Sequence, residues 1–166
     1  MTDAAAFDPL RALEALTEHG VSFVLIGGVA CRLHGSPSVT RDVDICYERS
    51  TENLERLAEV LQRVEARLRG VDADLPFLLD AKTLAAGSNF TFTTTLGDID
   101  ILAIPSGVDG FEELAASAER VDLETVEILM ASLEDLIRMK EAAARPKDLK
   151  EIDILEAIQA EIERGG

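Results

Sequence analysis

The stretch IGGVACRLHGSPSVTRDVDICY, from Ile26 to Tyr47, decides the fold of this chain. An apolar run ends in two glycines, a short amphipathic segment and a loop of small residues follow, and two aspartates then alternate with apolar residues. The pattern predicts a buried strand, a short helix, a loop and a second strand, at Val21–Ile26, Gly28–His34, Gly35–Arg41 and Asp42–Tyr47. Because successive side chains of a strand point to opposite faces, Asp42 and Asp44 share one face.

A second acidic stretch, GDIDIL from Gly97 to Leu102, again places two aspartates, Asp98 and Asp100, on one face of a strand. One such pair alone is consistent with a strand that has a solvated face. Two such strands side by side would bring three or four carboxylates together, which is unfavourable unless a cation compensates them. Oxygen ligands of this kind suit Mg²⁺ or Mn²⁺. Two such ions can clamp the attacking and leaving oxygens of a phosphoryl displacement.

Gly27 and Gly28 lie where the buried strand turns into the short helix. Without side chains there, a nucleotide phosphate can approach the backbone and the N–H groups at the start of the helix. Many strand-to-helix turns need glycine, so the pair is informative only together with the aspartates that follow it. Thr40 lies on the aspartate face and is a candidate to bind a carboxylate or a phosphate. Arg41 is a candidate phosphate ligand, although strand alternation points it away from the aspartates.

The rest of the chain predicts an α/β (α+β) fold, a mixed β-sheet with flanking helices in one domain over residues 1–166, with C-terminal helices 132–164 packed on it. Val71–Asp80 is not assigned. The last helix is expected to bury Leu149, Ile152, Leu155, Ile158 and Ile162. The predicted helices are Leu10–Glu18, Glu52–Arg69, Ala81–Ala86, Gly110–Ala118, Leu133–Ala143 and Pro146–Arg164. The predicted further strands are Asn89–Thr95, Asp98–Ile104, Glu119–Leu123 and Val126–Met130, the first two as a hairpin.

The net charge of −16, from 32 acidic and 16 basic side chains, disfavours nucleic acid and anionic lipid as partners. Five of the basic residues gather between Arg138 and Lys150, where a solvated helix surface and a functional cluster are both open. No stretch is apolar enough for a membrane, and the segment MTDAAAFDPL lacks a secretory pattern. Two cysteines are too few for a disulfide framework. We expect a cytoplasmic protein with no membrane partner.

The combination of motifs resembles the DNA polymerase β-like nucleotidyltransferase superfamily. In that pattern an apolar residue and two small residues precede Asp-x-Asp, and a third acidic residue follows on a later strand. Here Ile26-Gly27-Gly28 is followed by thirteen residues, by Asp42-Val43-Asp44 and later by Asp100. The resemblance implies a minimal nucleotidyltransferase fold, Mg²⁺ or Mn²⁺ ions held by Asp42, Asp44 and Asp100, and transfer of a nucleoside monophosphate from a nucleoside triphosphate.

A narrower resemblance covers nearly the whole chain. GGVACRLHG, SVTRDVDI, LGDIDIL and SLEDLIRMKEAAARPKDLKEIDIL together are similar to small AbiEii-type nucleotidyltransferases, the toxin side of some bacterial toxin–antitoxin pairs. This resemblance implies active-site roles for Lys140 and Asp148. Lys140 also continues the predicted buried stripe of its helix, so it is expected to face the aspartates and bind triphosphate, unless it extends to solvent at the helix end. Asp148 would orient this lysine or assist the acceptor hydroxyl.

The expected function is therefore nucleotidyl transfer onto a hydroxyl of RNA or tRNA, a protein or a small molecule, with RNA disfavoured by the net charge. The alternative is a non-catalytic nucleotide- or protein-binding module of the same fold. A small partner protein or self-association is compatible with the acidic surface. His34, at a predicted helix end, is expected to cap that helix. Asp98 is expected to support Asp100 and to stay outside the metal ligands.

Overall fold

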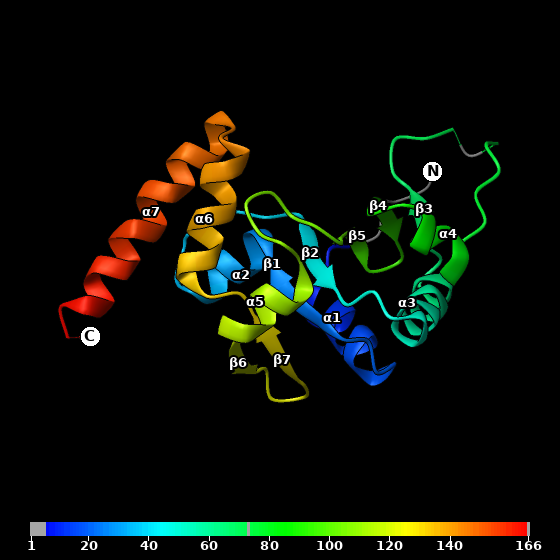
Figure 1. Ribbon diagram of the computed structural model, residues 1–166, viewed down its shortest axis with the longest axis horizontal. Coiled ribbons are helices and arrows are strands. Elements are labelled where there is room, and N and C mark those ends of the chain that lie inside the picture. Colours follow the sequence, from blue (N-terminus) through cyan, green and yellow to red (C-terminus); the bar gives the residue numbers. More distant parts are fainter. Residues whose placement is uncertain (1–5, 73, 166) are drawn as a thin grey trace.

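The computed structural model describes residues 6–72 and 74–165, and its described strands form one seven-stranded mixed sheet in the order β3-β4-β5-β2-β1-β7-β6 (Figure 1). The pairs β2–β5 and β1–β7 are parallel, and the other neighbours are antiparallel. The mixed sheet with flanking helices confirms the predicted fold class. The strands are β1 (Phe23–Ile26), β2 (Asp42–Tyr47), β3 (Arg67–Leu68), β4 (Asn89–Thr94), β5 (Gly97–Leu102), β6 (Glu119–Asp122) and β7 (Glu127–Met130).

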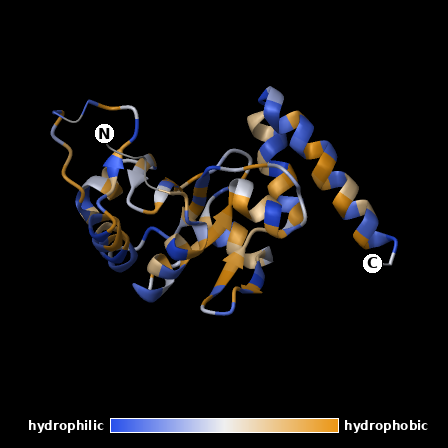
Figure 2. Cartoon of the chain, turned by 180° about the vertical axis from the view of Figure 1, so that it is seen from behind, coloured by the Kyte–Doolittle hydropathy of each residue, from blue (hydrophilic) through white to orange (hydrophobic). Residues whose placement is uncertain are grey.

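The helices lie around this sheet, with α6 and α7 at one end of the molecule and α3 and α4 at the other (Figure 1). α1 contacts β2, β7 and α3, and α2 contacts β1 and β2. The central strands are the most apolar part of the chain (Figure 2). The helices are α1 (Pro9–Glu18), α2 (Gly27–Leu33), α3 (Thr51–Arg63), α4 (Ala81–Ala86), α5 (Phe111–Ser117), α6 (Leu133–Ala143) and α7 (Pro146–Glu163). Each of the described helices is too short or too polar to span a lipid bilayer.

The β1–α2–β2 unit forms because its burial pattern and its turn agree. All four residues of β1 are buried, as a strand covered on both faces requires. Val43 and Ile45 of β2 are buried, whereas Asp42 and Asp44 on the opposite face are half-buried. Gly27 has a φ of +72°, which lets the chain pass directly from β1 into α2. The sequence pattern therefore sets the aspartate face of β2 against the start of α2.

Two predictions about the helices were wrong. The helix predicted over Glu52–Arg69 ends at Arg63, because Glu65 takes a φ of 53° and reverses the chain so that β3 pairs with β4. On α7, Leu149 and Ile162 are exposed, because the helix extends beyond the sheet and packs mainly against α6. The single-domain prediction and the missing secretory pattern both include residues 1–5, which lie outside the described residues.

Candidate active site

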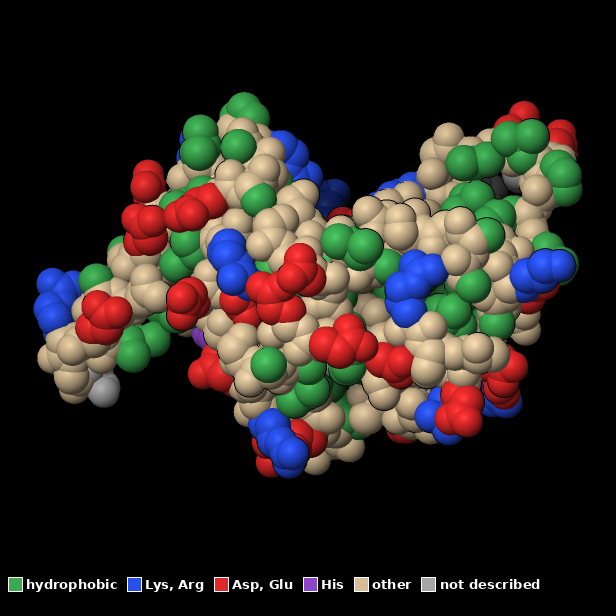
Figure 3. Space-filling view, in the orientation of Figure 1, with side chains coloured by type: hydrophobic (Ala, Val, Ile, Leu, Met, Phe, Trp, Pro, Cys, Tyr) green, Lys and Arg blue, Asp and Glu red, His purple; other side chains and the backbone are tan. Residues whose placement is uncertain are grey.

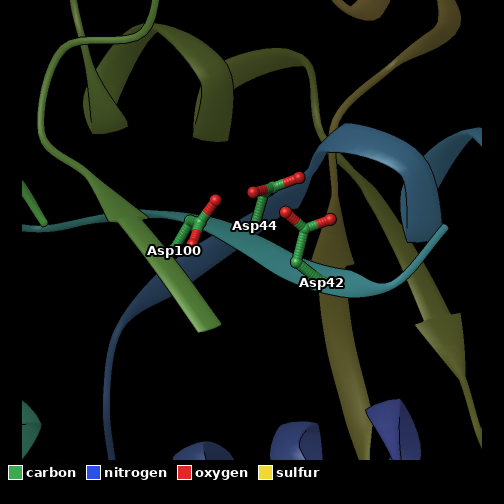
Figure 4. Close-up of side chains that lie close together, drawn as sticks. All are labelled: Asp42, Asp44 and Asp100. Atoms are coloured by element: carbon green, nitrogen blue, oxygen red, sulfur yellow. The ribbon is translucent and has the colours of Figure 1, made fainter. Parts of the chain in front are cut away.

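Three carboxylates meet where β2 and β5 run in parallel. The register of this pair sets Asp42 opposite Asp98 and Asp44 opposite Asp100, so all four aspartates lie on one face of the sheet. One oxygen of each of Asp42, Asp44 and Asp100 lies within 4.8 Å of the others (Figure 4). The two acidic strands are therefore adjacent, as predicted. Their pairing brings together the three aspartates that the sequence analysis assigned to metal binding.

Burial and the charges of neighbouring carboxylates make Asp44 and Asp100 difficult to ionise without a cation. Burial, followed by the charges of Asp42 and Asp100, raises the pKa of Asp44 to about 8. Burial also raises the pKa of Asp100, although Arg69 acts in the opposite direction. A divalent metal ion would offset both shifts by supplying positive charge to three convergent oxygen ligands. The donor set therefore fits a hard cation such as Mg²⁺ or Mn²⁺.

Arg69 is a site residue that the sequence did not reveal. Its Nη2 donates to Oδ1 of Asp100 over 2.6 Å, and its Nη1 lies 3.1 Å from Oδ2 of Asp98. Asp98 thus holds the arginine that holds Asp100, in agreement with its expected supporting role. Arg69 was hidden because the helix predicted over Glu52–Arg69 put it at a helix end, whereas the turn at Glu65 returns it to the sheet.

Both glycines of the motif have a packing requirement within the chain itself. A Cβ atom on Gly27 would lie 2.0 Å from Oδ2 of Asp44, and one on Gly28 would lie 2.5 Å from Oγ1 of Thr40. Thr40 in turn donates from Oγ1 to the backbone oxygen of Asp42 over 3.2 Å. The absence of side chains at residues 27 and 28 therefore lets the aspartate strand and its preceding loop lie against the start of α2.

Lys140 and Asp148 form the second charged group of the site. Lys140 Nζ lies 3.6 Å from Oδ1 of Asp148, and Nε of Arg145 donates to Oδ2 of Asp148 over 2.8 Å. Burial acts to raise the pKa of Asp148, but the hydrogen bonds from Arg145 outweigh it and leave the pKa below its usual value. The charge of Lys140 also acts to lower the pKa of Asp44. Lys140 is therefore paired with Asp148 and still within electrostatic reach of the three aspartates.

A cavity of about 910 Å³ connects these groups. It corresponds to the hollow between the two raised ends of the molecule (Figure 3). β2 and β5 form its acidic wall, and α6 and α7 form the wall that carries the basic residues. All the sequence-predicted site residues line it: Gly27, Gly28, Thr40, Arg41, Asp42, Asp44, Asp100, Lys140 and Asp148. Arg41 is exposed at this cavity.

His34 lies outside this cavity and has a structural role. It is the C-terminal cap residue of α2, as predicted, and its Nε2 donates to the backbone oxygen of Ala131 over 2.8 Å. The same nitrogen lies 3.4 Å from Oε2 of Glu119. His34 therefore ties α2 to the segment between β7 and α6.

The loop between α2 and β2 is held by a helix from the far end of the chain. Ser36 donates to Oε1 of Glu151 over 2.6 Å, and Ser38 donates to Oε2 of the same side chain over 2.5 Å. Glu151 and Ser36 are buried. The loop that carries Thr40 is thus fixed against α7, and nothing in the local sequence pattern of either segment indicated this contact.

The solved structures similar to this chain include an antibiotic adenylyltransferase and an antibiotic-resistance factor. The chain is similar to the lincosamide antibiotic adenylyltransferase LnuA in its lincomycin-bound form, with 16% identity, coverage of 90% of this chain and 94% of that one, and a TM-score of 0.60. It is similar to the antibiotic-resistance factor ANT(2'')-Ia in solution, with 15% identity, coverage of 93% and 89%, and a TM-score of 0.55. ANT(2'')-Ia in complex with adenylyl-2''-tobramycin gives 16% identity, coverage of 92% of each chain and a TM-score of 0.52.

The similarity to these solved structures establishes the fold, and a match to a family model establishes the family. No curated protein matches the chain in sequence. Residues 6–163 match the model of a family described as nucleotidyltransferase of unknown function, DUF6036. This range contains the glycine pair, the three convergent aspartates and both residues of the Lys140–Asp148 pair. The chain thus belongs to this nucleotidyltransferase family, and the narrower AbiEii resemblance is not part of that assignment.

Proposed function

We propose that this protein transfers a nucleoside monophosphate from a nucleoside triphosphate to an acceptor hydroxyl and requires Mg²⁺ or Mn²⁺. The observation that carries the proposal is the convergence of Asp42, Asp44 and Asp100, whose ligand atoms lie within 4.8 Å of one another at a cavity. Three clustered carboxylates are unfavourable in a site that binds no cation. A module that binds only protein has no physical reason for such a cluster, and the transfer assay below separates catalysis from nucleotide binding alone.

The site residues divide the work of the reaction. Asp42, Asp44 and Asp100 would hold the metal ions, which when bound stabilise the charge that develops on the transferred phosphoryl group. Gly27 and Gly28 leave the backbone accessible to the nucleotide phosphates. The acceptor oxygen forms a bond to the α-phosphorus, the bond from that phosphorus to the bridging oxygen breaks, and pyrophosphate leaves. The hydroxyl proton passes to solvent.

Lys140 is proposed to bind the triphosphate, together with Thr40 and Arg41, which line the same cavity. Both oxygens of Asp148 are engaged: Arg145 donates to both, and Lys140 lies near Oδ1 as well. This occupancy favours a role for Asp148 in orienting Lys140 over a role as proton acceptor. An aspartate that positions a cation needs to stay ionised, which its lowered pKa supports.

The test uses each of the four NTPs labelled with radioactive phosphorus at the α position, together with Mg²⁺ and a cell extract of RNA, protein and metabolites. Wild-type protein should transfer label to an acceptor, and Asp44→Asn should reduce the rate by about 1000-fold or more. Equal labelling by both proteins would contradict the proposal. Calorimetric binding of NTP by the wild type without transfer to any acceptor would favour the binding module.

A toxin-like role is a second proposal, which rests on the contact between Lys140 and Asp148. These are the two residues that the AbiEii resemblance singled out. Induced expression of the wild type in bacteria should then arrest growth, whereas Asp44→Asn expressed to the same level should not. Normal growth with active enzyme would reject the toxin role and leave nucleotidyl transfer intact. A small-molecule acceptor, as the names of LnuA and ANT(2'')-Ia state for those proteins, would fit that outcome.

A further inference from the structure

Three of the four lysines in the chain line the cavity. These are Lys140, Lys147 and Lys150, all on the α6–α7 wall. The fourth, Lys82, lies in α4 and does not line it. In a chain of net charge −16, this gathering sets a local positive surface in an otherwise negative field. Lys and Arg side chains are visible on the flank of the hollow below the α6–α7 corner (Figure 3).

Two of these lysines are available to a ligand. Lys147, Lys150, Glu151 and Ile154 follow helical spacing along one stripe of α7, and all four line the cavity. The carboxylate of Glu151 accepts hydrogen bonds from the two loop serines. Within the described part of the chain, the exposed Lys147 and Lys150 form no ion pair. Arg145 differs from them because Asp148 holds it.

The triphosphate does not need these two charges. A nucleoside triphosphate brings divalent cations that offset its own charge, and Lys140 stands within electrostatic reach of Asp44. Lys147 and Lys150 lie on the next helix along the same wall, beside the half-buried Ile154. Exposed lysines of this kind bind phosphate or carboxylate groups as point charges.

We propose that the acceptor is an anion: a hydroxyl compound whose phosphate or carboxylate group binds Lys147 and Lys150. The inference rests on the proposed function and adds the chemical class of its second substrate. The anionic group serves for binding only, since the bond to the α-phosphorus is made by the acceptor hydroxyl. The net charge of the chain disfavours long polyanions, but this local surface accommodates a single anionic group or the end of a chain.

The first experiment divides the acceptors by charge before the reaction. A cell extract is passed over an anion-exchange resin, and the bound and unbound fractions are each incubated with the protein, Mg²⁺ and α-labelled NTPs. Labelled acceptor should form from the bound fraction. Labelling that depends on Asp44 but comes from the unbound fraction would overturn this inference and leave the proposed function standing. No labelling from either fraction would overturn both.

The second experiment compares two variants of equal charge. Lys147→Gln/Lys150→Gln and Lys82→Glu each lower the net charge by two, but only the first changes the cavity. We expect the first to raise the KM for the bound-fraction acceptor by about 10-fold or more, because each charge-assisted contact is worth a factor of this order. The KM should also lose much of its dependence on salt. Lys82→Glu should match the wild type in both respects.

Calorimetry with Mg²⁺ and NTP, in the absence of acceptor, decides whether the lysines serve the nucleotide instead. The double variant should bind NTP as the wild type does, and a 10-fold loss of NTP affinity would overturn the inference. Two treatments of the bound fraction then identify the source of the anion. Loss of labelling after ribonuclease digestion indicates an RNA end, whereas acceptor that passes a small-pore filter indicates a phosphorylated or carboxylated metabolite.

Discussion

The two walls of the cavity carry opposite charges on opposite kinds of secondary structure. The acidic wall consists of short aspartate side chains on two hydrogen-bonded strands, so the ladder between β2 and β5 fixes where the carboxylates lie. The basic wall consists of long side chains on α6 and α7, of which Lys140 and Arg145 pair with one buried carboxylate, Asp148. Metal binding requires ligand positions accurate to a few tenths of an ångström, whereas anion binding tolerates flexible donors. The acidic wall, which the strands hold rigidly, is thus suited to metal binding. The basic wall, whose long side chains are flexible, is suited to binding an anionic substrate.

The largest expected effect comes from disturbing the rigid wall. Gly27→Ala would place a Cβ atom 2.0 Å from Oδ2 of Asp44 and strain a residue with a φ of +72°. We expect nucleotidyl transfer to fall by about 1000-fold, equivalent to about 4 kcal/mol in the barrier. The matched control is Gly70→Ala, which has a similar φ of +77° but no atom within 4 Å. Transfer at the wild-type rate by Gly27→Ala would show that the acidic wall is not rigid.

The anchor of the basic wall gives the next largest effect. Asp148→Asn removes the buried charge that pairs with Lys140 and Arg145, and we expect the free energy of unfolding to fall by about 3 kcal/mol. Because the pKa of Asp148 is lowered in the folded protein, its contribution is present above pH 4 and is lost as the pH falls below that. Urea unfolding of this variant and of the exposed Asp153→Asn, on the same helix, measures the difference. Equal stability of the two variants would contradict the anchoring role.

The acidic wall should show the opposite pH dependence. The pKa of Asp44 is raised to about 8, so the folded protein keeps a proton that the unfolded chain has lost, and stability falls as the pH rises from about 4 to 8. In the presence of EDTA, Asp44→Asn should therefore equal the wild type in stability near pH 4 and be more stable than the wild type at pH 8. Thermal unfolding at both pH values tests this. Added Mg²⁺ should abolish the difference, and a variant less stable than the wild type at pH 8 would be inconsistent with it.

The smallest effect is expected at an ion pair that belongs to neither wall. Arg63 Nη2 lies 3.0 Å from Oε1 of Glu59 on the exposed surface of α3. Arg63→Ala should change the free energy of unfolding by less than about 0.5 kcal/mol, because solvent screens the pair and both side chains lose freedom in forming it. Urea unfolding in low and high salt provides the measurement. If Arg63→Ala lowered the free energy of unfolding as much as Asp148→Asn does, ion pairs at the cavity would not differ in strength from those on the exposed surface.

Local patterns were sufficient for the acidic wall. The spacing of Gly27, Gly28, Asp42 and Asp44 indicated the strand, the turn and the shared face, and β2 and α6 have the predicted bounds. Helical spacing also set Lys140 at the cavity. These features depend on side-chain periodicity and backbone conformation over a few residues, which a sequence records directly.

Contacts between distant segments could not be predicted in the same way. Arg69 reaches Asp100 only because Glu65 adopts a positive φ, and a glutamate at that position gives no sign of it. The exposed Leu149 likewise follows from where α7 leaves the body of the protein, although its helical spacing matches a core position. Glu151 had no local signal as the partner of two serines. The contacts and exposure of each of these residues depend on tertiary geometry, which sequence periodicity does not record.

The contact between Ser36 and Glu151 joins residues 115 positions apart, and this separation sets the order in which the site is completed during synthesis. At a rate of about 5–20 residues per second, Ser36 is made roughly 6 to 23 seconds before Glu151. During that interval the nascent chain contains the aspartates of β2 but lacks the helix that holds their neighbouring loop. The loop beside the aspartates therefore reaches its observed arrangement only after α7 has been made and has docked.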